Sequence, residues 1–144
     1  MSSTGLDVFD KTVQKTNEIL KDIEEQLNWQ GHRNQSYHVL RVILHALRDR
    51  LTVAIAVKFA DQLPILLRGV FYESWRPEST PLKLHRTEFV HNIREKIIFS
   101  FKPSIEELIK IVLESICKHM PASEISKLKG NLPEDLQALI SQPQ

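Results

Sequence analysis

A Leu-Pro step occurs twice in this chain, at Leu63-Pro64 and at Leu132-Pro133. The shift along the chain that places Leu63 on Leu132, called the repeat offset below, also aligns residues 33–71 with residues 102–140, with five identities. Lys58 with Lys127 is one of the identities, and other pairs, such as Phe59 with Leu128, keep apolar or basic character. Two unrelated amphipathic stretches would share helical periodicity, but they would not explain both Leu-Pro steps. We therefore interpret the chain as an internal duplication.

Helical periodicity fills most of the sequence between its few breaks. Only four glycines and seven prolines occur in 144 residues, and no run of alternating apolar and polar residues predicts a strand. We expect helices at about 6–28, 35–50, 53–62, 64–74, 86–100, 104–119, 122–129 and from 133. The sequence thus predicts an all-α fold of about eight helices, arranged as two pseudo-symmetric four-helix repeats in one compact bundle.

The repeats span about 6–74 and 86–141, and a proline-containing linker at 75–85 joins them within one helical domain of residues 1–144. The helices at 35–50 and 104–119 are the most apolar, so they should lie at the centre. Thr52 and Ser104 are suited to cap the helices that follow them. Leu63 and Leu132 should be buried. In the helix at 86–100, the residues expected to face inward are Phe89, Val90, Ile93, Ile97 and Ile98.

Charge and composition exclude several classes of partner. The formal net charge is +1; residues 1–74 carry nine basic and nine acidic residues, and residues 75–144 carry ten and nine. This balance argues against nucleic-acid binding through bulk positive charge and against a polybasic membrane patch. No apolar run approaches the ~20 residues that span a bilayer, so we expect no membrane span. One cysteine, Cys117, and a start without signal-peptide character predict a cytoplasmic protein.

The run Tyr37–Leu51, followed by the run Gln62–Trp75 that contains the first Leu-Pro step, resembles a bacterial family. The family is the one catalogued as domain of unknown function 2267, and the resemblance covers roughly residues 6–140. It implies an all-α fold of two related helical halves. It brings no catalytic residues, because the family has no established activity. Ser74 stands where we expect a glycine before Trp75, which bears on how tightly this turn closes.

The favoured functional hypothesis is a non-enzymatic protein-interaction or regulatory module with a protein partner and no cofactor. No glycine-rich phosphate loop, nucleophile elbow or Glu-x-x-His motif is present. One predicted surface is the polar stripe of the helix at 35–50; the other is the tail after the first Leu-Pro helix, rich in residues typical of interface hot spots. These residues are His38, Arg41, His45 and Arg48 in the stripe, and Tyr72, Trp75 and Arg76 in the tail. The simpler interpretations are a solvated stripe and a Trp75 that packs back over the helix ends.

The alternative hypothesis is a small-ligand or metal site between the two halves. His38 and His45 are seven residues apart, which is too far for both to bind one metal directly from one helix. The repeat offset places Glu107 and Glu114 at the matching positions. These four side chains could converge if the two central helices packed face to face. Cys117 lacks a legible activating arrangement, so we interpret it as a partly buried, unreactive thiol.

Overall fold

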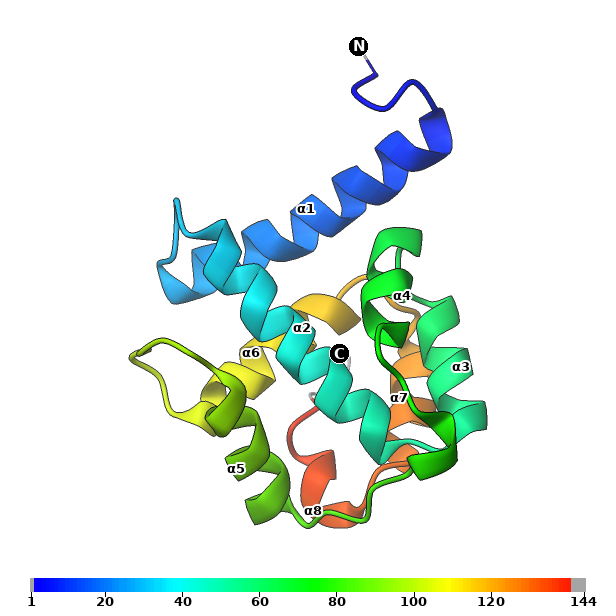
Figure 1. Ribbon diagram of the computed structural model, residues 1–144, viewed down its shortest axis with the longest axis vertical. Helices are drawn as coiled ribbons and strands as arrows, with labels where there is room; N and C mark the ends of the chain where they lie inside the picture. Colours follow the sequence, from blue (N-terminus) through cyan, green and yellow to red (C-terminus); the bar gives the residue numbers. More distant parts are fainter. Residues whose placement is uncertain (1, 141–144) are drawn as a thin grey trace.

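The computed structural model describes residues 2–140, which form eight α-helices and one short 3-10 helix and contain no strand (Figure 1). The all-α prediction is therefore confirmed. The helices are α1 (Asp7–Leu27), α2 (Arg33–Arg50), α3 (Val53–Asp61), α4 (Ile65–Tyr72), α5 (Arg86–Lys96), α6 (Ile105–Cys117), α7 (Ala122–Gly130) and α8 (Glu134–Gln137), with η1 (Pro77–Ser79) in the linker. Within residues 2–140, no helix is long and apolar enough to cross a membrane.

Side-chain caps and prolines define where several helices begin. The hydroxyl of Thr52 accepts a hydrogen bond from Ile55 N at 3.4 Å, and that of Ser104 accepts one from Glu107 N at 3.2 Å. Both caps confirm the sequence prediction, because these hydroxyls satisfy amides that have no partner within the helix. Pro64 was predicted as the first residue of its helix, but it is the N-cap of α4, with an extended ψ of 147°.

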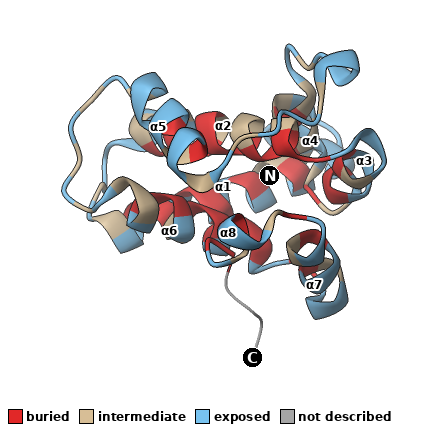
Figure 2. Cartoon of the chain, turned by 90° about the horizontal axis from the view of Figure 1, so that it is seen from below, coloured by how far each residue is buried: buried red, intermediate tan, exposed pale blue. Residues whose placement is uncertain are grey.

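Helix α2 runs through the middle of the molecule and packs against α1, α4, α5 and α6 (Figure 1). Its buried apolar residues occupy most of its circumference, as the sequence predicts for a central helix. Figure 2 shows these buried positions along α2, with others along α6. Leu63 and Leu132 are 3% and 6% exposed, so the burial predicted for both Leu-Pro steps is confirmed.

Some helix boundaries coincide under the repeat offset of the sequence, whereas those of α2 and α6 do not. Helices α3 and α7 begin and end at residues that this offset pairs, and α4 and α8 begin at paired residues. Both Pro64 and Pro133 are N-caps, with ψ of 147° in each case. Helices α3 and α7 also pack against each other. Each Leu-Pro step thus lies directly before the start of a helix.

The segment after α5 departs from the prediction. The helix expected at 86–100 ends at Lys96, and Ile97 is extended, with ψ of 119°. Ile98, predicted to face inward, is 83% exposed. Phe99 packs inward instead, edge-on against Trp29 with ring centroids 5.5 Å apart. This aromatic contact outweighs continuation of the helix through β-branched residues, which favour helices only weakly.

Candidate functional site

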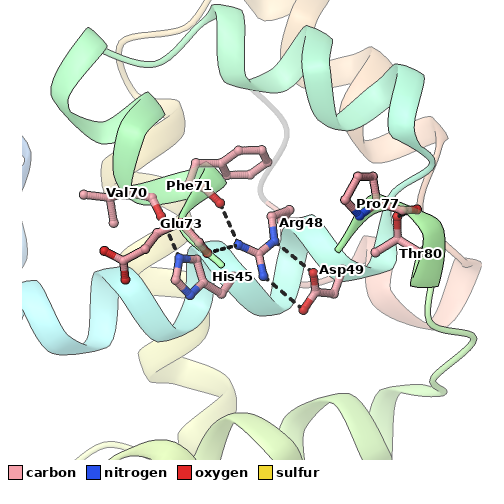
Figure 3. A network of polar contacts seen from close by, with 8 residues as sticks. All are labelled: His45, Arg48, Asp49, Val70, Phe71, Glu73, Pro77 and Thr80. Carbon is pink, nitrogen blue, oxygen red and sulfur yellow. Dashed lines mark hydrogen bonds and ion pairs between the residues drawn. The ribbon is translucent and has the colours of Figure 1, made fainter. Parts of the chain in front are cut away.

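Arg48 lies at the centre of a buried polar network between α2 and the end of α4 (Figure 3). Its Nη1 donates to the carbonyl oxygens of Phe71 and Glu73, both at 2.8 Å, and its Nε donates to Asp49 Oδ1 at 2.9 Å. Carbonyls at the C-terminal end of a helix have no partner within the helix. The guanidinium of Arg48 supplies those partners and holds the end of α4 against α2.

His45 extends this network by one turn of α2. Its Nε2 lies 2.6 Å from Val70 O, so the neutral ring donates a hydrogen bond from this nitrogen (Figure 3). Burial lowers the pKa of His45, and the positive charges of Arg48 and Arg41 lower it further. The neutral form is therefore the one that fits this position.

Most side chains of the polar stripe predicted as an interaction surface make polar contacts within the protein. Arg48 is only 5% exposed, which corrects its placement in a solvated stripe. Arg41 forms an ion pair with Glu73, and His38 Nε2 lies 2.9 Å from Lys96 O. The physical reason is that α2 is surrounded by other helices, so its polar side chains meet the carbonyl ends of α4 and α5. The stripe therefore connects α2 to the C-terminal ends of α4 and α5.

The second predicted surface, Tyr72, Trp75 and Arg76, folds back onto the protein except for its last residue. The rings of Tyr72 and Trp75 stack with centroids 5.3 Å apart, and Trp75 is partly buried against the core. Arg76 is exposed. Ser74 closes the turn between the two rings with φ of 60°, a left-handed conformation that favours glycine. The interpretation of Trp75 as packed over the helix ends agrees with this arrangement.

The four predicted metal ligands do not converge. Glu107 and Glu114 are exposed on α6, whereas His38 and His45 are directed at backbone carbonyls. Among residues 2–140, no three His, Cys, Asp or Glu side chains lie close enough together to hold an ion. Helices α2 and α6 pack through apolar residues, which turns their polar sides away from each other.

Cys117 is buried at the end of α6, and this burial raises the pKa of its thiol to about 12. A thiol in this environment stays protonated and is a poor nucleophile.

A hollow of about 190 Å³ lies between α3 and α7 and was not predicted. Its apolar lining consists of Ile55, Phe59, Met120 and Leu128. Phe59 and Leu128 are each 4% exposed, so they are the most buried residues of this lining. Its polar lining consists of Lys58, Gln62, Glu124, Lys127 and Asn131. An apolar concavity with a few polar side chains is the usual form of a small-molecule site.

Eight of the nine lining residues form four pairs that the repeat offset relates. The pairs are Ile55 with Glu124, Lys58 with Lys127, Phe59 with Leu128, and Gln62 with Asn131. The sequence alignment already matched the second and third of these pairs. The missing information was that α3 and α7 lie side by side, which brings matching faces of the two helices together.

The electrostatics of the hollow are unequal on its two sides. Lys127 Nζ lies 3.6 Å from Glu124 Oε1 on the same helix. Within the described residues, Lys58 has no ion-pair partner, and Ile55 stands where Glu124 stands on the other helix. Two lysines and one glutamate leave one positive charge in excess. The arrangement provides apolar contact and a local positive charge.

The sequence of residues 16–139 matches a protein family described as "Uncharacterized conserved protein (DUF2267)". The chain belongs to this family. The resemblance drawn from the two sequence runs is therefore confirmed. The matched region extends from α1 through α8, so both the Arg48 network and the α3–α7 hollow lie within this DUF2267 domain. No curated protein matches the chain. The family description assigns no activity.

Proposed function

We propose that this DUF2267 member is a non-catalytic binding module that takes up the apolar part of a small molecule in the α3–α7 hollow. The observation that carries this proposal is the hollow itself, about 190 Å³ in volume and lined in part by four apolar side chains. For comparison, an apolar cavity of roughly 150 Å³ is large enough to bind benzene. The hollow has room for a short alkyl chain or a single ring.

This proposal keeps the non-enzymatic part of the sequence hypothesis and changes the partner. A stable protein interface buries about 800 Å² on each partner and commonly centres on exposed aromatic and arginine side chains. Here Arg48 is buried, and the rings of Tyr72 and Trp75 stack on each other. The surfaces predicted for a protein partner are therefore less suited to that role than the hollow is to a small ligand.

A duplicated four-helix unit would explain why the hollow lies where it does. We propose such an origin for the two halves, with α3 and α7 as corresponding helices. The support is the repeat offset, which is common to their boundaries, to the Leu-Pro steps and to four pairs of lining residues.

Filling the hollow tests the proposed function. Straight-chain carboxylates and alcohols of about six to ten carbons, sized to an apolar cavity of this order, would be titrated into the protein by calorimetry. We expect binding of at least one series by the wild type and loss of that binding in Ile55→Phe, whose larger ring occupies the hollow. Val57→Phe is the matched control, because Val57 lies on α3 and is 40% exposed but does not line the hollow.

Two results would refute the assignment of the site. One is an absence of binding by every compound in both series. The other is binding to Ile55→Phe with the same affinity as to the wild type and to Val57→Phe.

A further inference from the structure

The lysines of the hollow are placed where one end of a bound molecule would meet them. Lys58 and Lys127 both line the hollow, one from each helix, together with the buried Phe59 and Leu128. Each lies in the last turn of its helix. The apolar residues would hold an alkyl chain, and the two ammonium groups lie beside it.

The partners of these lysines leave positive charge available. Lys127 forms an ion pair with Glu124, and in that pair the side chain of Lys127 is 68% exposed. Within residues 2–140, no carboxylate lies within ion-pair distance of Lys58. The position on α3 that corresponds to Glu124 is occupied by the apolar Ile55. An anion bound here would pair with Lys58, and no existing ion pair would have to break.

A simpler role for the two lysines is to balance the partial negative charge at the C-terminal ends of α3 and α7. That role needs only a cation in the last turn. In α7, Lys129 also lies in the last turn and satisfies it without lining the hollow, whereas in α3 Lys58 is the one basic residue of the last turn and can serve both roles. The dipole role therefore does not require Lys127, and it does not explain why both lysines line one apolar hollow.

We infer that the ligand of the α3–α7 hollow is a small amphipathic anion, a short alkyl chain with one carboxylate that lies between Lys58 and Lys127. This inference rests on the proposed function, because the alkyl chain occupies the same hollow. It adds the sign and the position of the charged end. Glu124 is the one group of the lining that opposes such a ligand, and its pairing with Lys127 reduces that opposition.

Three probes of equal chain length test separately whether the hollow binds an alkyl chain and whether it prefers an anion. Octanoate, 1-octanol and octylammonium would each be titrated into the full chain by calorimetry at low salt. We expect octanoate to bind at least threefold more tightly than 1-octanol, and octylammonium to bind most weakly, since a partly exposed ion pair contributes a few-fold in affinity. The preference for octanoate should decrease as salt is added.

Charge variants then locate the carboxylate. Lys58→Gln and Lys127→Gln should each weaken octanoate binding about threefold and leave 1-octanol binding unchanged. Glu124→Gln should strengthen octanoate binding, because it removes the opposing charge and releases Lys127. Lys129→Gln is the matched control and should change neither affinity.

The outcomes distinguish the inference from the function on which it rests. Equal affinities for octanoate and 1-octanol, unchanged in the Lys58 and Lys127 variants, would overturn the anionic ligand and leave a neutral apolar ligand for the hollow. Tighter binding of octylammonium would overturn the inference in the same way. If none of the three probes binds, the inference and the proposed function both fail.

Discussion

Lys58 and Lys127 are paired by the repeat offset, occupy corresponding positions in α3 and α7, and line the same hollow. This relationship follows from two independent features: the repeat in the sequence and the packing of α3 against α7. Packing alone would place two helices together without matching their faces. The repeat alone would place two lysines in register without bringing them to one site. Together they place both lysines at one hollow, which we propose as the binding site.

Arg48 should contribute strongly to stability because it is the buried donor for the end of α4. We expect Arg48→Ala to lower the free energy of unfolding by about 2–4 kcal/mol, since the carbonyls of Phe71 and Glu73 lose their donor and Asp49 loses its partner. Urea denaturation measures this change. Arg41→Ala, which removes an exposed ion pair, is the control and should have a much smaller effect. Equal effects of the two substitutions would contradict the role of Arg48.

His45 should make stability depend on pH. Its folded-state pKa is lower than its ordinary value of 6.5, so the unfolded chain binds a proton more readily than the folded protein does. The contribution of neutral His45 to the free energy of unfolding is therefore fully present above about pH 6.5. It is lost as the pH falls through the lower folded-state pKa. His45→Gln keeps a donor for Val70 O and removes the titration.

The measurement is the free energy of unfolding of both proteins between pH 7.5 and 5. The wild type should lose more stability than His45→Gln over this range. Parallel pH profiles for the two proteins would show that His45 does not carry this dependence.

Ser74 provides a test of backbone strain. Its φ of 60° is unfavourable for a residue with a side chain, and its side chain is exposed. We expect Ser74→Gly to stabilise the protein by about 0.5–1 kcal/mol, because relief of the strain exceeds the entropy that glycine adds to the unfolded chain. Ser79→Gly in η1 lacks this strain and should destabilise slightly. Thermal denaturation compares them; a lower melting temperature for Ser74→Gly would contradict the account.

The first Leu-Pro step should be essential to folding. Leu63 is 3% exposed, so Leu63→Asp places a carboxylate in the core without a partner and should unfold or aggregate the protein. Ile65→Asp is the matched control, because Ile65 lies two residues away and is 51% exposed. Circular dichroism melts compare the variants. A cooperative melt of Leu63→Asp at the wild-type temperature would refute a structural role for this step.

The helices could be predicted from sequence because their information is local. The spacing of apolar residues, the caps at Thr52 and Ser104, and the two Leu-Pro steps each act within a few residues. The end of α5 could not be predicted in this way. It depends on the contact of Phe99 with Trp29, which lies far away in the sequence, just after α1, and this contact leaves Ile98 exposed.

The site residues were harder to predict because their roles depend on which helix ends meet. From the sequence alone, an arginine in a polar stripe is predicted to be exposed. In the structure, the carbonyls at the end of α4 lie against Arg48. The hollow likewise requires the packing of α3 on α7. The alignment at the repeat offset held part of this information, since it already paired Lys58 with Lys127 and Phe59 with Leu128.

The central claim, that the α3–α7 hollow is the binding site, is tested most directly by amide chemical shifts in a titration with octanoate. Two-dimensional nitrogen–proton NMR spectra of the full chain report the position of a ligand residue by residue. The account predicts saturable shifts concentrated at residues 55–62 and 120–131, and their loss in Ile55→Phe. Shifts concentrated at other elements, or an unchanged spectrum at millimolar octanoate, would contradict it.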